Sequence, residues 1–215
     1  MAVDTRYIVV EGPIGVGKTT LAHRIAERLG MEVLSERAEE NPFLEGFYRN
    51  PEKMAFQAQL YFLMQRSEQL RELRQRDLFR PGLIADFSFH KDRLFASLNL
   101  SDAEFDLYDR VYRTLELEVP TPDLVVYLQA PVDVLLERIR RRRLPFEQGI
   151  GTEYLQRLAE AYVDFFYHYD DSPLLIVNAA DINPAERDRD LDVLMEQIEA
   201  VRTGRHYFNP TPLAL

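Results

Sequence analysis

A glycine-rich motif near the start of the chain has the composition of a phosphate-binding loop. Its residues fit the pattern G-x-x-x-x-G-K-[ST], with an apolar strand-like segment before it and a helical segment after it. Glycines let successive backbone N–H groups point at phosphate oxygens, and the helix start adds positive potential. The loop, residues 12–20, consists of Gly12, Pro13, Ile14, Gly15, Val16, Gly17, Lys18, Thr19 and Thr20.

Two side chains of this loop have expected chemical roles. Lys18 is expected to bridge the β- and γ-phosphates of ATP, and the Thr19 hydroxyl is expected to bind Mg²⁺. The alternative is a glycine-rich turn that binds nothing, but the flanking segments favour the nucleotide site. The motif identifies a nucleotide site without identifying the reaction.

An arginine cluster distinguishes between classes of P-loop protein. The guanine-binding N-K-x-D and the switch motif D-x-x-G of GTPases are absent, whereas residues 138–143 read Arg-Ile-Arg-Arg-Arg-Arg. Small P-loop kinases close such a lid over ATP, where guanidinium groups offset the charge of the transferred phosphoryl group. Arg138 and Arg142 lie one helical turn apart and are the catalytic candidates. The alternative is a basic helix end that complements the helix dipole.

The composition limits the partners. The chain has 26 Lys and Arg against 36 Asp and Glu, a formal net charge of −10, which disfavours nucleic acid polymers and anionic membranes. It has no cysteine, which excludes disulfides and thiolate chemistry. We find no signal-peptide pattern and no apolar run approaching about 18 residues, so a cytoplasmic protein is expected.

Alternating strand-like and helical segments predict the fold. Nearly continuous apolar strands followed by helices indicate a doubly wound parallel sheet, and the length fits a single domain, residues 1–215. The class is α/β: a P-loop NTPase fold with a five-stranded parallel sheet flanked by helices and an arginine-rich lid over about 138–150. The expected strands are Tyr7–Val10, Glu32–Leu34, Gly82–Ala85, Leu124–Leu128 and Leu174–Val177.

Helical periodicity covers much of the remaining chain, and the C-terminal residues, about 204–215, carry two prolines and no periodicity. We expect that segment to be a loosely held tail. The expected helices are Thr19–Leu29, Glu52–Arg76, Ala103–Leu117, Val132–Arg141, Gly151–Tyr169 and Asp188–Thr203.

A glutamate follows the second expected strand, in Ser35-Glu36-Arg37-Ala38-Glu39-Glu40. With the P-loop and the arginine lid, this segment resembles the deoxynucleoside kinase family, and the similarity extends to about residue 170. The resemblance implies that Glu36 is the general base that takes the proton from a nucleoside 5′-hydroxyl. Glu39 and Glu40 are the nearby alternatives.

The resemblance also implies a set of nucleoside-binding residues. Tyr48, in Tyr48-Arg49-Asn50-Pro51-Glu52, corresponds to the family's tyrosine that contacts the sugar 3′-hydroxyl. Gln59, preferred over Gln57 by spacing, falls where the family reads the base. Arg66 and Asp92 correspond to the base-reading arginine–aspartate pair.

The lid completes the sugar site, because Glu147 in Glu147-Gln148-Gly149-Ile150 resembles the family's glutamate that reaches the 3′-hydroxyl opposite Tyr48. Both contacts favour deoxyribose. Leu144 occupies a place where some members carry a further lid arginine.

The chain departs from the family after the third expected strand. The family motif D/E-R-S corresponds to Asp86-Phe87-Ser88, so Asp86 fits the carboxylate near Mg²⁺ but Phe87 replaces the arginine. Either Lys91 or Arg93 supplies the missing cation, or the site is arranged differently.

These residues predict the substrate class. A guanidinium can donate to purine N7 or O6 or to cytosine N3, and a carboxylate accepts from an exocyclic amine, which thymine lacks. Gln59, Arg66 and Asp92 therefore favour purine deoxynucleosides, with deoxycytidine second. The alternatives are another small-molecule or nucleoside monophosphate kinase, and a catalytically silent relative acting as a structural subunit. The family resemblance also implies a homodimer.

Overall fold

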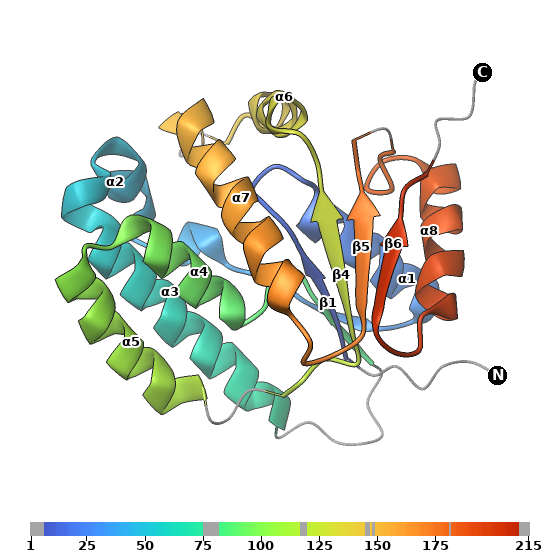
Figure 1. Ribbon diagram of the computed structural model, residues 1–215, viewed down its shortest axis with the longest axis horizontal. Coiled ribbons are helices and arrows are strands. Elements are labelled where there is room, and N and C mark those ends of the chain that lie inside the picture. The colour runs from blue at the N-terminus through green and yellow to red at the C-terminus, as the bar shows by residue number, and fades with distance from the viewer. Residues whose placement is uncertain are drawn as a thin grey trace.

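Six parallel strands form the centre of the molecule in the computed structural model, which describes residues 7–74, 82–116, 120–144, 147, 149–180 and 182–210. The strand order in this part of the chain is β2-β3-β1-β4-β5-β6 (Figure 1). The strands are β1 (Tyr7–Glu11), β2 (Glu32–Leu34), β3 (Leu83–Ala85), β4 (Leu124–Gln129), β5 (Leu174–Asn178) and β6 (Arg205–Phe208). The predicted parallel sheet flanked by helices is thus confirmed.

The sixth strand corrects two predictions. A five-stranded sheet was expected, and the segment from about 204 was expected to be a loosely held tail. Instead Arg205–Phe208 pairs in parallel with β5, with Leu174 opposite Arg205 and Val177 opposite Phe208. The strand escaped prediction because it lies at the sheet edge, where polar and exposed side chains replace the apolar run of a central strand. Residues 211–215 of the expected tail lie outside the described residues.

The long helices begin and end close to the expected residues, although the last residues of the expected helix Glu52–Arg76 lie outside the described part. Two shorter helices, α2 and α4, were not predicted. The buried residues of α4 include Lys91 and Asp92, so an apolar periodicity could not reveal it. The helices are α1 (Lys18–Leu29), α2 (Leu44–Arg49), α3 (Pro51–Arg74), α4 (His90–Asn99), α5 (Asp102–Glu116), α6 (Val132–Arg142), α7 (Thr152–His168) and α8 (Asp188–Ala200).

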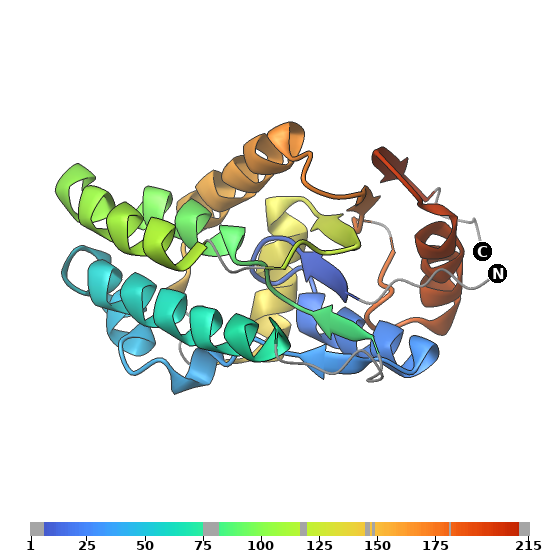
Figure 2. The ribbon, with the colours of Figure 1, turned by 90° about the horizontal axis from the view of Figure 1, so that it is seen from below.

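Helices cover both faces of the sheet (Figure 2). On one face α1 and α8 pack Leu21, Ile25 and Leu194 against the strands, and on the other α7 packs Leu158 and Tyr162. Burial of these apolar side chains on both faces explains the continuous apolar sequence of the central strands. In the part of the chain described here, no helix is both long and apolar enough to cross a membrane.

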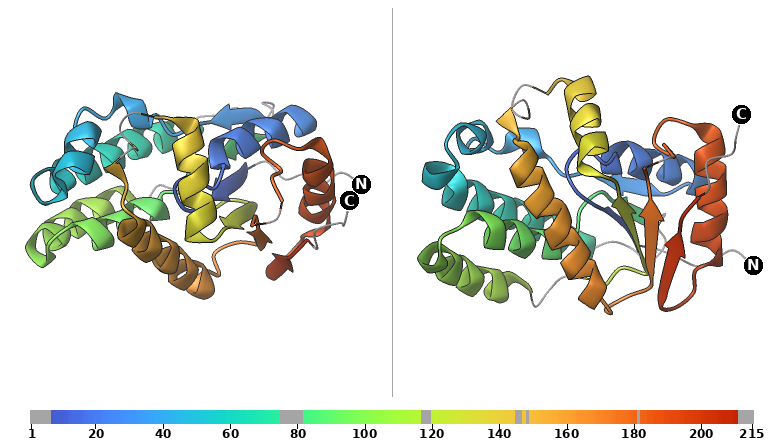
Figure 3. Two further views of the ribbon diagram at one scale, coloured as in Figure 1. Left: turned by 90° about the horizontal axis from the view of Figure 1, so that it is seen from above. Right: turned by 45° about the horizontal axis from the view of Figure 1, so that its top comes forward.

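A second group of helices, α2 to α5, extends the molecule to one side of the sheet (Figure 1). Leu63 and Leu70 of α3 pack with Tyr108 and Tyr112 of α5 in a separate apolar cluster. Seen from above the carboxyl ends of the strands, α6 lies over the sheet and α2 lies farther out, at the end of α3 (Figure 3, left). The site lies between these two elements.

Candidate active site

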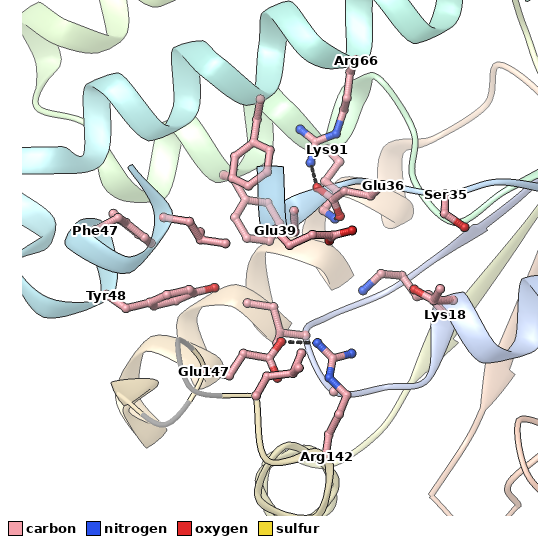
Figure 4. A pocket seen from close by; sticks show the side chains of 18 of the residues that line it. Lys18, Ser35, Glu36, Glu39, Phe47, Tyr48, Arg66, Lys91, Arg142 and Glu147 are labelled. Atoms are coloured by element: carbon pink, nitrogen blue, oxygen red, sulfur yellow. Dashed lines mark hydrogen bonds and ion pairs between the residues drawn. The ribbon is translucent and has the colours of Figure 1, made fainter. Parts of the chain in front are cut away.

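A cavity of about 530 Å³ opens between the P-loop, α3 and the lid. Figure 4 shows Lys18 at one end and Tyr48 at the other, with Glu36 on one side and the Arg142–Glu147 pair facing it. The polar or charged residues that line the cavity are Lys18, Thr19, Thr20, His23, Ser35, Glu36, Glu39, Tyr48, Gln59, Arg66, Lys91, Arg142 and Glu147. P-loop residues, Glu36 and four of the five predicted nucleoside-binding residues thus line one cavity.

The P-loop requires glycine where it approaches other backbone. Gly12 has φ 149°, and a Cβ there would come within 2.5 Å of the Leu128 carbonyl oxygen. Gly15 has φ 86°, and a Cβ would lie 2.8 Å from the Leu135 carbonyl oxygen. At both positions the backbone conformation and the close contact exclude any side chain larger than that of glycine. The two glycines thus allow the loop between β1 and α1 to lie close to β4 and α6.

Lys18 is held inside this loop. Its Nζ donates to the carbonyl oxygens of Gly12, at 2.8 Å, and Pro13, at 3.2 Å. Burial, together with the positive charge of the nearby Lys91, lowers the pKa of the Lys18 ammonium to about 8. Nearby phosphate oxygens would stabilise the protonated, charged form of Lys18. This side chain is therefore suited to bind an anionic ligand.

Glu36 is fixed by three neighbours. Its backbone N–H donates to Asp86 Oδ1 at 2.7 Å, which ties the segment after β2 to the end of β3. Arg66 donates to one carboxylate oxygen, and Lys91 Nζ donates to the other at 2.5 Å. The carboxylate is therefore oriented from both sides at the cavity wall.

The protonation state of Glu36 follows from these contacts. Burial opposes ionisation, but Arg66 and Lys91 outweigh it and hold the pKa of the carboxyl well below its usual range. Of the alternatives, Glu39 also lines the cavity, whereas Glu40 lies outside it and is bound by Arg37 and Gln65. The ionised Glu36 is the best-oriented carboxylate of the three.

Arg66 connects Glu36 to Asp92. One guanidinium nitrogen donates to Glu36 and the other to Asp92, which is fully buried at the start of α4. Burial raises the pKa of Asp92 to about 7, although Arg66 acts against the rise. Asp92 does not line the cavity; it lies behind Arg66 and fixes the guanidinium there.

Tyr48, Gln59 and Glu147 also line the cavity, and Tyr48 lies at the end opposite Lys18 (Figure 4). Gln59 is 3% exposed, whereas the alternative Gln57 is exposed to solvent. Glu147 accepts from Arg142, and its second carboxylate oxygen is buried with no hydrogen-bond partner among the described residues. Burial raises the pKa of Glu147, against the effect of Arg142. Such a carboxylate can accept from a ligand hydroxyl.

Arg138 lies elsewhere. Its guanidinium donates to the carbonyl oxygens of Val16, Ala179 and Ile182, at 3.2, 2.9 and 3.4 Å. The structure therefore places it between the P-loop and the segment after β5, not among the residues of the cavity. In that segment Asp181 lies outside the described residues.

The predicted metal ligands come from two elements that meet beside the P-loop. Thr19 belongs to the first turn of α1, and Asp86 follows β3. A hydroxyl and a carboxylate are the oxygen donors that Mg²⁺ prefers beside nucleotide phosphates, so the donor chemistry fits this ion.

Sequence reasoning missed Glu11. This buried carboxylate accepts from the N–H groups of Gly12, at 3.0 Å, and Ser88, at 2.7 Å, and from the Tyr162 hydroxyl at 3.0 Å. It thereby joins the P-loop, the loop after β3 and α7. The available signal was a charged residue ending an otherwise apolar strand. The apolar lining, Leu44, Phe47, Phe62 and Phe95, was also missed.

A parallel sheet with a glycine-rich loop between β1 and α1, and a carboxylate-bearing cavity beside it, defines a P-loop phosphotransferase. The chain belongs to the deoxynucleoside kinase family, since the family model "Deoxynucleoside kinase" matches residues 8–202. The family resemblance inferred from the motifs is thereby confirmed, and the chain is an enzyme of the phosphotransferase class.

Individual relatives agree with this assignment. A deoxyguanosine kinase of Bacillus subtilis (strain 168) is 37% identical over 157 residues, covering 73% of this chain and 76% of the relative. A deoxyadenosine kinase of Dictyostelium discoideum is 32% identical, covering 76% and 68%. The solved structure of deoxyadenosine kinase from M. mycoides with bound dATP matches with a TM-score of 0.79 and 28% identity, covering 90% of this chain and 98% of that one.

Proposed function

We propose that the protein transfers the γ-phosphoryl group of ATP to the 5′-hydroxyl of a deoxynucleoside, with purine deoxynucleosides preferred and deoxycytidine second. The observation that carries this proposal is the placement of Glu36. Its oriented, ionised carboxylate lies in the same cavity as Lys18, opposite the polar groups at the far end. That arrangement leaves room for an alcohol between a base and a phosphate site.

The reaction divides among residues of this cavity. Glu36 accepts the 5′-hydroxyl proton while an oxygen lone pair forms the bond to the γ-phosphorus. The bond from the γ-phosphorus to the bridging oxygen breaks, and its electron pair leaves with ADP. Lys18 and Arg142 offset the charge of the transferred group. Mg²⁺, held by Thr19 and Asp86, would supply charge neutralisation of the phosphates.

The acceptor end favours a neutral nucleoside over a nucleoside monophosphate. Arg142 is paired with Glu147, and Arg66 is paired with both Glu36 and Asp92. Carboxylates thus already offset much of the positive charge of these guanidinium groups, so an acceptor phosphate, in addition to the phosphates of ATP, would meet little further positive charge. A sugar hydroxyl instead suits Glu147, whose second oxygen has no partner among the described residues.

Base selection would rest on Gln59 and Arg66, which line the cavity, with Asp92 orienting Arg66 from behind. The names of the relatives, deoxyguanosine kinase and deoxyadenosine kinase, support the purine preference. Arg138 would act by holding the P-loop against the segment after β5. A homodimer and a cytoplasmic location remain predictions.

The test is direct. The purified protein is mixed with ATP and Mg²⁺ and with each of deoxyadenosine, deoxyguanosine, deoxycytidine, thymidine, adenosine and guanosine, and 5′-monophosphates are quantified. We expect the purine deoxynucleosides to turn over fastest. Thymidine as the best substrate would contradict the base assignment, and no product from any nucleoside would contradict the kinase assignment.

A further inference from the structure

Lys91 occupies a position in the cavity that its sequence context does not reveal. It lies in the first turn of α4, only 7% exposed, and lines the cavity together with Lys18. Its Nζ donates to the Glu36 carboxylate at 2.5 Å, on the opposite oxygen from Arg66 (Figure 4). Burying an ammonium is costly, so a buried lysine at a cavity wall needs a specific reason.

The position where the resemblance implies an arginine cannot supply a cation. Phe87 is fully buried in the apolar cluster of α3 and α5, and its ring lies 5.7 Å from the Arg66 guanidinium carbon. The other cation considered, Arg93, points away: its side chain is 52% exposed and donates to Asp109 of α5 at 2.9 Å. Of the two cations considered from the sequence, only Lys91 lines the cavity, which leaves a differently arranged site as the other alternative.

We propose that Lys91 is the catalytic cation of the acceptor side, which holds Glu36 with one N–H and contacts the transferred phosphoryl group with another. This inference rests on the proposed function. An ammonium has three donors, so the contact with Glu36 leaves two available for phosphoryl oxygens. Phe87 in turn fills the space of the absent arginine with apolar contacts.

In the proposed reaction, the negative charge that balances Lys91 decreases as the proton is transferred to Glu36. In the free protein, Lys91 and Arg66 balance Glu36 and Asp92, while Lys18 is bound only to carbonyl oxygens among its described contacts. When Glu36 accepts the 5′-hydroxyl proton it becomes neutral, and the positive charge of Lys91 is no longer balanced by it. The attraction of Lys91 for phosphoryl oxygens therefore grows as the transition state forms, which is the interaction that raises kcat.

Proximity of the two lysines supports the same assignment. Lys18 and Lys91 line the same cavity, and Lys91 Nζ donates to Glu36 on the cavity wall. Two ammonium groups that line one cavity repel each other in the free protein and are stabilised together by one anion between them. The γ-phosphoryl group bound by Lys18 is such an anion.

Three variants test the proposal: Lys91→Met, which removes the charge, Lys91→Arg, which keeps it, and Arg93→Met as the matched control for loss of a nearby cation. Thermal unfolding and ATP binding establish that each variant is folded. We expect Lys91→Met to lower kcat by about 100-fold with little change in KM for ATP, as for loss of one charge-stabilising donor. Lys91→Arg should recover at least tenfold of that loss, and Arg93→Met should stay within about twofold of the starting protein.

A pH profile separates catalysis from a structural effect. Because Lys91 donates to Glu36 and is one of three cations that lower its pKa, its removal should move the acidic limb of kcat/KM to higher pH. A Lys91→Met protein with kcat within threefold and an unmoved acidic limb would overturn the proposal. So would a loss of kcat that Lys91→Arg does not reduce. If the unaltered protein phosphorylates no deoxynucleoside, it is the proposed function that fails.

Discussion

The guanidinium of Arg66 donates a hydrogen bond to Glu36, so the residue expected to read the nucleobase is bound directly to the expected general base. The same guanidinium donates to Asp92. In the proposed mechanism, base recognition and proton transfer therefore both involve the side chain of Arg66. A nucleobase that draws hydrogen bonds from Arg66 also changes the field at Glu36.

The ion pair between Arg66 and Asp92 leads to a prediction about the stability of the protein. Arg66→Met leaves Asp92 buried without its partner, and breaking such a pair should lower the free energy of unfolding by about 3–5 kcal/mol. Adding Asp92→Asn removes the unpaired charge and should recover at least half of that loss. Urea unfolding of the two single variants and the double variant measures the coupling. Additive losses would show that the two side chains do not form one ion pair.

The lowered pKa of Lys18 predicts how ATP binding depends on pH. Phosphate oxygens favour the charged ammonium, so the bound state has the higher pKa and binding takes up a proton where free Lys18 is neutral. Affinity should be constant below about pH 8 and then fall, by up to about tenfold per pH unit, as pH rises above it. Titration calorimetry in buffers of different ionisation enthalpy measures this uptake.

A variant provides the comparison for that profile. Lys91→Met removes a positive charge that lowers the Lys18 pKa, so the onset of the loss in affinity should move to higher pH. An onset that stays in place, or affinity that rises with pH, would show that Lys18 does not bind the phosphates as described.

The proposed role of Gln59 in nucleobase recognition can be tested by comparison with Gln57 on the same helix. Gln59→Leu removes a buried amide from the cavity and should lower kcat/KM for the preferred purine deoxynucleoside by about 10- to 100-fold. Gln57→Leu, on the exposed face of the same helix, is the matched control and should change it little. Equal effects of the two substitutions on kcat/KM would contradict a role for Gln59 in binding the nucleobase.

The edge strand β6 can be tested in the same way. Phe208 is partly buried against the core, so Phe208→Ala should lower the free energy of unfolding by about 1–3 kcal/mol, less than for a fully buried phenylalanine. Tyr207, 64% exposed on the same strand, serves as the control, and Tyr207→Ala should cost under about 0.5 kcal/mol. Chemical unfolding measures both, and indistinguishable values would contradict the described pairing.

The features that were predictable from sequence depend on local patterns. The P-loop is a contiguous motif whose glycines are required by short-range contacts, as at Gly12 and Gly15. The central strands are apolar because both of their faces are covered, so their pattern is visible without knowledge of the fold. For the same reason the edge strand β6, with three exposed residues, was missed.

The contacts that position the site were less predictable because they join distant segments. Glu11 receives hydrogen bonds from Ser88 and Tyr162, and Glu36 from Arg66 and Lys91, at separations that no local pattern encodes. The choice between Lys91 and Arg93 depended on which face of α4 is buried. That face buries Lys91 and Asp92 besides Leu94 and Ala96, so an apolar periodicity could not identify it.

Glu36 is the proposed general base for transfer from ATP to a deoxynucleoside. The most direct measurement compares transfer rates at saturating ATP for Glu36→Gln, Glu39→Gln and Glu40→Gln, with ATP binding measured for each. We predict that Glu36→Gln lowers kcat by about 10²- to 10⁴-fold with ATP binding retained, and that Glu39→Gln lowers it by less than about tenfold. A Glu36→Gln protein that transfers phosphate at the original rate, or a larger loss in Glu39→Gln, would contradict the account.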